Sequence, residues 1–364
     1  MAALALHQFH EKARACFFDL NSMETVRDYG NPAAEYQALR ESVAILDLSS
    51  RSRLCVLGAD RQRFLNGQVT NNVKDLKTGL GCYAALVTAK GKMQSDLNIY
   101  CLENELLLDF EPGLGAAVQS RLEKYIIAED AQVVDAAPHY GLLSVQGPRA
   151  NAALENLFRD RPQKAFAVSR FEDAAFGEIY LANQPRIGTT GFDLFVPTDR
   201  LPTAIETLLT ETQAAGGRLC GWTALETARI EAGIPRFGAD MDETNLAPEA
   251  GLDNRAISYS KGCYIGQEVI SRIRTYGQVA KSLRGLRLPD DLPALPVRGD
   301  KLFFNGKEAG YITSATASPR LRANIALAYI RREANQIGTE LLLETASGKF
   351  PARIAEVPFT TVNG

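Results

Sequence analysis

Short apolar runs and helix-spaced apolar stripes succeed one another along the first 230 residues. The apolar runs predict five strands, at 53–57, 82–87, 93–101, 105–110 and 141–145. Stripes with apolar residues three or four positions apart predict five helices, over 33–45, 114–127, 149–158, 200–215 and 222–231. Clusters of strands between helices, without regular alternation of strand and helix, indicate an α+β fold rather than a doubly wound sheet.

A change of pattern marks the last fifth of the chain. Three prolines within 288–296 predict an extended linker, so we place a domain boundary between 287 and 288. Short strand-like runs follow, and Asn305-Gly306 between two of them is a strong hairpin signal. We therefore expect residues 1–287 to hold the α+β region and residues 288–364 to form a small antiparallel β-barrel or sandwich.

Composition and charge narrow the function classes. The chain has 364 residues, 46% of them hydrophobic, and a net charge of −3, which gives no reason to expect direct nucleic-acid binding. No apolar run reaches the length of a membrane span, and the N-terminus lacks the features of a signal or transit peptide, so a cytoplasmic protein is expected. Six scattered cysteines, without C-x-x-C, indicate a reducing compartment and no structural zinc site.

The segment 261–268, K-G-C-Y-I-G-Q-E, carries the most distinctive local chemistry. A lysine two residues before Cys263 can favour the thiolate, and the glycines at 262 and 266 permit a tight turn. The alternative is a glycine-rich turn with an incidental cysteine, and the local residues leave both interpretations open.

A second candidate lies on the strand predicted at 93–101. Side chains alternate along a strand, so Asp96 shares one face with Gln94, Asn98 and Tyr100. That face is suited to line a cavity for a flat, hydrogen-bonding ligand. A solvated outer face is the alternative. Arg229 lies in the helix predicted at 222–231. From the helix pattern alone it is an ordinary solvated charge.

The segment 261–268 resembles the K-G-C-[FY]-x-G-Q-E signature of the YgfZ family, folate-binding proteins related to the T-protein (aminomethyltransferase) of glycine cleavage. Other blocks are similar to that family's and occur in its order. They are F-L-N-G-Q-V-T-N at 64–71, G-K-M-Q-S-D at 91–96, R-I-E-A-G-I-P at 229–235 and P-E-A-G-L at 248–252. The resemblance implies two interleaved α+β domains and a C-terminal barrel, arranged as a three-domain ring.

The same resemblance implies a pocket for tetrahydrofolate or a one-carbon derivative. Asp96 stands where the T-protein has a carboxylate near the reacting folate nitrogens, and Tyr83 matches an aromatic residue of the pocket wall. Arg229 matches an arginine that can pair with folate carboxylates. The T-protein T-G-E motif is altered here, with Phe192 in place of the glutamate and Asp193 one position later as a shorter substitute.

The function implied is that of an accessory protein for assembly or repair of iron–sulfur clusters, rather than a conventional turnover enzyme. Cys263 would be the working thiol and Lys261 would tune it. Gly262, Tyr264 and Gly266 would shape the loop, while Gln267 and Glu268 would order it or contact a partner. The expected partners are iron–sulfur assembly proteins or client enzymes, including tRNA-modifying ones, and a monomer is expected. The alternatives are a tetrahydrofolate-dependent aminomethyltransferase, or a folate-binding scaffold in which Cys263 only packs.

Overall fold

The computed structural model of the chain describes residues 1–277 and 279–360. They form two compact units, each built from segments far apart in the sequence. The first unit comprises Met1–Leu86, Ser95–Glu226 and Ser260–Tyr264, and the second comprises Val87–Gln94, Thr227–Tyr259 and Ile265–Gly364. No helix in these described ranges is both long and apolar enough to cross a membrane.

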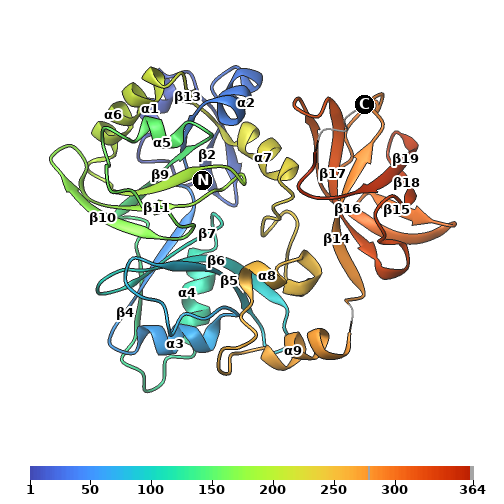
Figure 1. Cartoon of the computed structure of the whole chain (residues 1–364), viewed down its shortest axis with the longest axis horizontal. Coiled ribbons are helices and arrows are strands. Elements are labelled where there is room, and N and C mark those ends of the chain that lie inside the picture. Colours follow the sequence, from blue (N-terminus) through green and yellow to red (C-terminus); the bar gives the residue numbers. More distant parts are fainter. Residues whose placement is uncertain (278, 361–364) are drawn as a thin grey trace. The chain divides into compact units, whose positions relative to one another are not determined.

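One half of the first unit is a six-stranded sheet with helices on one face (Figure 1). The strand order is β10 (Val168–Asp173), β11 (Gly177–Asn183), β12 (Gly191–Pro197), β9 (Tyr140–Gln146), β3 (Ala44–Asp47) and β13 (Arg218–Leu219). The neighbouring helices are α1 (His7–Lys12), α2 (Pro32–Glu41), α5 (Ala150–Ala153) and α6 (Leu201–Ala214). Apolar side chains of alternate strand positions, such as Val145 and Leu194, pack with α6 in one core.

The other half is a five-stranded sheet with α3 (Arg61–Gln68) and α4 (Gly115–Glu123) beside it. Its order is β5 (Gly81–Val87), β6 (Met93–Cys101), β7 (Leu106–Phe110), β4 (Ser52–Leu57) and β8 (Gln132–Asp135). Leu97, Ile99 and Cys101 of β6 face the core that this sheet shares with the two helices. The hairpin of β1 (Cys16–Leu20) and β2 (Met23–Asp28) completes the strands of this unit, and α7 (Trp222–Glu231) leads out of it.

The two sheets meet through the faces that turn away from their helices. Tyr100 of β6 donates to Gln184 Oε1 at 3.1 Å, and its ring lies 5.7 Å from that of Phe195 on β12. Asn98 and Asp109 of the five-stranded sheet lie on the same buried face. Asn98 and Tyr100 of the predicted polar face are therefore buried between the sheets, whereas Gln94 and Asp96 are half-buried.

The second unit contains a closed antiparallel barrel of six strands. Their order is β14 (Lys281–Leu288), β17 (Ala323–Arg331), β16 (Lys307–Ser318), β15 (Lys301–Phe304), β18 (Glu340–Thr345) and β19 (Gly348–Ala355). Short helical segments accompany it: η1 (Ala247–Ala250), α8 (Asp253–Ala256), α9 (Gln267–Tyr276) and η2 (Arg332–Ala334). The fold is thus two α+β domains and a C-terminal barrel, which confirms the predicted fold class.

Several predicted boundaries need correction. The helix expected over 33–45 ends at Glu41, because Ala44–Asp47 pairs with β9 as strand β3. The helix expected over 149–158 shortens to Ala150–Ala153. The barrel already begins with β14 at Lys281, so the proline-rich segment 288–296 is a loop inside the barrel rather than a linker before it.

Candidate functional site

Asp96 projects from β6 on the face opposite the hydrophobic core. Tyr83, on the adjacent strand β5, donates its hydroxyl hydrogen to Asp96 Oδ2 at 2.8 Å. The other oxygen, Oδ1, is buried and has no hydrogen-bond partner among the described residues. Burial raises the pKa of Asp96 to about 6; the nearby Glu111 carboxylate adds to this and the Tyr83 hydrogen bond opposes it. A carboxyl group of this kind can exchange a proton close to neutral pH.

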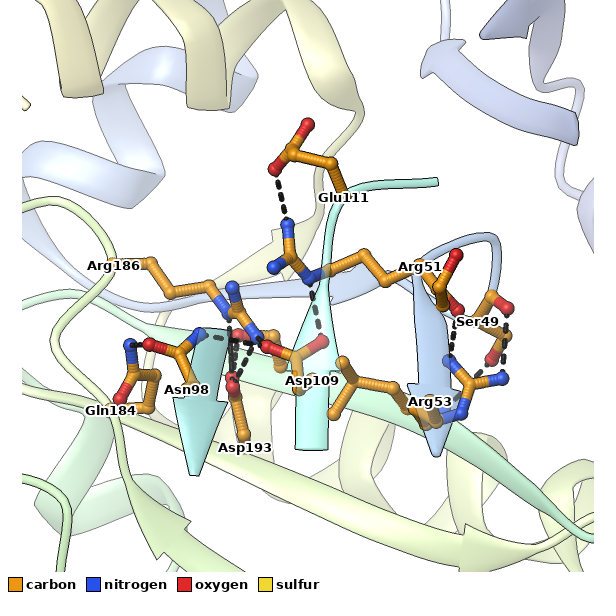
Figure 2. A network of polar contacts seen from close by, with 12 residues as sticks. Ser49, Arg51, Arg53, Asn98, Asp109, Glu111, Gln184, Arg186 and Asp193 are labelled. Carbon is orange, nitrogen blue, oxygen red and sulfur yellow. Dashed lines mark hydrogen bonds and ion pairs between the residues drawn. The ribbon is translucent and has the colours of Figure 1, made fainter. Parts of the chain in front are cut away.

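A buried ion-pair network joins the two sheets of the first unit (Figure 2). Arg51 donates to Asp109 at 2.7 Å and to Glu111 at 2.6 Å. Arg186 reaches the other Asp109 oxygen at 2.8 Å and also pairs with Asp193. Burial alone would raise the pKa of Asp109, but the two guanidinium groups hold it well below its usual range. Asp109 is therefore a fixed negative charge that joins the two arginines.

Asp193 is the substitute carboxylate of the altered T-G-E segment. On β12 its neighbour Phe192 enters the hydrophobic core, and the alternation of side chains turns Asp193 to the opposite face. There Ser144 donates to its Oδ1 at 2.7 Å, and Arg186 Nε lies 2.9 Å from its Oδ2. The carboxylate is fully buried and satisfied by this chain's own donors. Its predicted contact with folate stays a prediction.

Lys261, the first residue of the signature segment, is buried. Its ammonium donates to three backbone carbonyls, Asn66 O at 2.6 Å, Val69 O at 2.8 Å and Asn71 O at 2.6 Å. Burial lowers its pKa to about 8, and Cys82 opposes this. Lys261 therefore ties the signature segment to the 64–71 block, which lies about 190 positions earlier in the sequence. These contacts assign it an anchoring role, and its action on the Cys263 thiol stays a prediction.

The thiol of Cys263 is exposed, whereas the other five cysteines are buried or half-buried, and all six are free. Its neighbour Tyr264 is buried, with the Lys261 ammonium 4.9 Å from its ring centroid. Gly262, on the other side of Cys263, has no positive φ and so makes no use of the backbone freedom that glycine permits. The thiol thus stands at the surface beside two buried side chains.

The second glycine of the signature behaves differently. Gly266 has φ +83°, and a Cβ there would lie 2.5 Å from the backbone oxygen of Thr88. It directly precedes α9, whose first two residues are Gln267 and Glu268. Gly266 is therefore the residue that lets the chain enter α9 in close contact with the tip of the β5–β6 hairpin.

Arg229 belongs to the second unit and is buried. It forms an ion pair with Asp240, and its Nη2 donates to Ser314 Oγ at 2.8 Å. Asp240 also accepts a hydrogen bond from Thr313 at 2.6 Å. The guanidinium is therefore held by hydrogen bonds that involve strand β16 of the barrel. The structure does not show Arg229 as a solvated helix charge. Its predicted pairing with folate carboxylates stays a prediction.

Sequence reasoning missed the arginine–carboxylate network around Asp109. A signal was present, because Arg51 and Arg53 are spaced by two at the start of a strand, and Asp109 and Glu111 are spaced by two at the end of another. Charges two apart share a strand face, and strands β4 and β7 are neighbours. Arg186, from the loop between β11 and β12, carried no comparable signal.

Comparisons with known proteins agree with this architecture. The GCVT N-terminal domain family matches residues 6–261, and the glycine cleavage T-protein C-terminal barrel domain matches residues 281–360. The chain is 29% identical over 360 residues to the aminomethyltransferase of Shouchella clausii, covering 97% of this chain and 96% of that one. It is 28% identical to the aminomethyltransferase of Bacillus subtilis, with 94% of each chain covered.

A solved structure shares the fold. The glycine cleavage system aminomethyltransferase T of Bartonella henselae superimposes with a TM-score of 0.86 at 22% sequence identity. The superposition covers 99% of this chain and 98% of that one. At this identity the likeness establishes the architecture and leaves the chemistry to the residues of the site.

Proposed function

Because the chain belongs to the glycine cleavage T-protein family, we propose that it binds tetrahydrofolate, or a one-carbon derivative of it, at Asp96. The observation that carries the proposal is the buried, unpartnered Oδ1 of Asp96. A buried carboxylate oxygen without a partner costs free energy, and a ligand N–H donor would remove that cost. The reduced pterin ring offers such donors on a flat surface.

The residues around Asp96 suit this ligand. With its pKa raised to about 6, Asp96 is mostly ionised at neutral pH yet close enough to its pKa to exchange a proton. Tyr83 fixes one carboxylate oxygen and leaves the other for the ligand. Tetrahydrofolate would bring one-carbon chemistry at its ring nitrogens, while Asp96 would orient those nitrogens and hold or accept a proton at Oδ1.

Tetrahydrofolate titration tests this part directly. Asp96→Asn should weaken binding about tenfold or more, since a hydrogen bond to a charged acceptor is lost. Asp60→Asn, at a surface carboxylate paired with Arg63, serves as the matched control and should bind as wild type does. Equal binding by the wild type and Asp96→Asn would exclude Asp96 from the folate site.

We further propose that this folate-binding protein acts through Cys263 in the assembly or repair of iron–sulfur clusters. Its partners would be assembly proteins or client enzymes. The K-G-C-Y-I-G-Q-E segment supports this reading, because it presents one exposed thiol on an anchored loop. A solitary thiolate is suited to transient ligation or thiol exchange, whereas a resident cluster takes about four cysteines. The iron or sulfide would be cargo rather than a resident cofactor.

The test is complementation in cells that lack the native protein. Cys263→Ala should fail to restore the activities of iron–sulfur enzymes, including tRNA-thiolating ones, while still binding tetrahydrofolate. The half-buried Cys16 gives the control, because Cys16→Ala removes a thiol outside the signature segment. Full rescue by Cys263→Ala would remove the thiol from the function.

A second candidate is aminomethyl transfer from a lipoyl carrier to tetrahydrofolate. Similarity over nearly the full length of proteins named aminomethyltransferase favours it. The altered T-G-E segment weighs against it, because Phe192 lies in the core and Asp193 is already bound by Arg186 and Ser144. Ammonia release from an aminomethyl-lipoyl carrier protein in the presence of tetrahydrofolate would establish this activity, and we expect none.

A further inference from the structure

A polar cavity of about 570 Å³ lies in the second unit, and none of the candidate site residues discussed above lines it. It is bounded by residues from α8, from the C-terminal half of α9, from the first half of β14 and from η2. Arg274, Arg284 and Arg332 line it, together with a single carboxylate, Asp253. In a chain of net charge −3, such a concentration of guanidinium groups calls for a physical explanation.

None of the three arginines has an ion-pair partner among the described residues. Arg284 donates from Nε to Asn335 O at 3.1 Å and from Nη1 to Leu283 O. Its Nη2 group is left to interact with a ligand in the cavity. Burial lowers the pKa of Arg284, as expected of a cation held without a counter-charge. Arg332 is exposed, its backbone N–H donates to Ala280 O at 3.0 Å, and its guanidinium has no hydrogen-bond partner within the described ranges.

Arg274 is held in position by an aromatic ring. Its guanidinium carbon lies 4.0 Å from the centroid of the Tyr259 ring, and the Tyr259 hydroxyl in turn donates to Asp253 at 2.7 Å. Stacking on the ring face fixes the plane of the guanidinium while leaving its N–H edges available. The cavity therefore has one pre-oriented arginine and a second, Arg284, fixed by backbone carbonyls.

We propose that this cavity binds a phosphomonoester. Three guanidinium groups against one carboxylate leave a net charge of about +2, which matches the charge of about −2 on a phosphate monoester at neutral pH. Guanidinium groups bind phosphate through paired N–H donors. The cavity is larger than a phosphate group, and Pro248 and Ile273 add apolar wall. An organic moiety would occupy the remaining volume, with Ser282 and Asn335 as hydrogen-bonding partners.

Calorimetric titration with AMP tests the proposal, with adenosine and glutarate as comparison ligands. AMP should bind, and adenosine and the dicarboxylate should bind at least tenfold more weakly. Arg284→Ala should weaken AMP binding about tenfold. Arg287→Ala is the matched control on the same strand, because Arg287 reaches Thr360 O and does not line the cavity; it should bind as wild type does.

The charge balance gives a test of opposite sign. Asp253→Asn removes the one negative charge of the cavity and keeps an oxygen acceptor for Tyr259, so it should tighten AMP binding severalfold. A 5′-phosphorylated oligonucleotide bound more tightly than AMP would identify a nucleic-acid end as the source of the phosphate. Equal binding of AMP and adenosine, glutarate binding as tight as AMP, or an unchanged affinity of Arg284→Ala would each overturn the proposal. Tetrahydrofolate binding is measured separately and does not enter these outcomes.

Discussion

At the scale of single residues, two buried ionisable groups behave in opposite ways. Asp96 keeps one carboxylate oxygen without a partner, whereas the Lys261 ammonium is satisfied by three carbonyls. A group left unsatisfied inside a fold is a place where a ligand gains binding energy, and a satisfied one stabilises the fold itself. Both residues lie in sequence blocks that resemble those of the family. The sequence alone could not show which of the two is unsatisfied and which is satisfied.

The raised pKa of Asp96 has a consequence for stability. A carboxyl group whose pKa is higher in the folded than in the unfolded chain contributes stability below its unfolded pKa of about 4. That contribution is lost as the pH rises to the folded pKa of about 6. Asp96→Asn cannot ionise, so its free energy of unfolding should rise relative to wild type by up to about 3 kcal/mol between pH 4 and pH 7.

Urea unfolding of both proteins at pH 4.5 and pH 7 measures this difference. Asp60→Asn provides the control, because the surface pair with Arg63 lowers the pKa of Asp60 instead of raising it. A difference between Asp96→Asn and wild type that does not change with pH would show that the Asp96 pKa is not raised.

Removing the Lys261 ammonium should be costly. Lys261→Met keeps an unbranched apolar side chain, one atom shorter than lysine, but leaves the carbonyls of Asn66, Val69 and Asn71 without their donor. A lost partner for a buried group costs about 1–3 kcal/mol, so we expect a loss of this size or more in thermal or urea unfolding. Lys90→Met, at an exposed lysine, should change stability by less than about 0.5 kcal/mol. Equal effects of the two substitutions would contradict an anchoring role.

At the scale of secondary structure, the sequence pattern predicted well those strands, helices and turns that depend mainly on neighbouring residues in the chain. The strand Met93–Cys101 and the helix Trp222–Glu231 have the predicted bounds, and Asn305-Gly306 forms the two-residue turn between β15 and β16, with φ of +50° and +75°. Long-range pairing decided the rest. Ala44 and Ile45 were predicted as the end of a helix, but they begin strand β3, which lies between β9 and β13. No local signal could show that β14 precedes the prolines and closes the barrel.

The two glycines of the signature loop give a prediction at this scale. Gly266→Ala places a methyl group 2.5 Å from Thr88 O at a φ of +83°, so the backbone must shift and the loop should be destabilised by at least about 1–2 kcal/mol. Gly262→Ala meets no atom within 4 Å and should cost much less. Hydrogen exchange of the α9 amides and urea unfolding compare the two. A Gly262→Ala effect as large as that of Gly266→Ala would exclude this explanation.

At the scale of the whole molecule, the family determines the architecture and individual residues determine the chemistry. Two matching domain families cover residues 6–261 and 281–360 of this chain. The sequence predicted the fold class, because patterns and blocks of local sequence carry it, and the role of Asp96 stays a prediction. It could not predict the Asp109 network, whose members meet only when two sheets pack together. Within this shared fold, Phe192 packs in the core and Asp193 is bound by Ser144 and Arg186, so this segment has to be judged by its own residues.

Ligand-linked stability tests the folate proposal on the intact chain. A ligand that binds only the folded state raises the free energy of unfolding by about 2.7 kcal/mol at one hundred times its Kd. Saturating tetrahydrofolate should therefore raise the Tm of wild type by several degrees. Cys263→Ala should show the same shift, because the exposed thiol is not part of the proposed pocket. Arg284→Ala should also retain it, whereas Asp96→Ala should lose most of it. A full shift in Asp96→Ala, or none in wild type, would place folate elsewhere or remove it from the function.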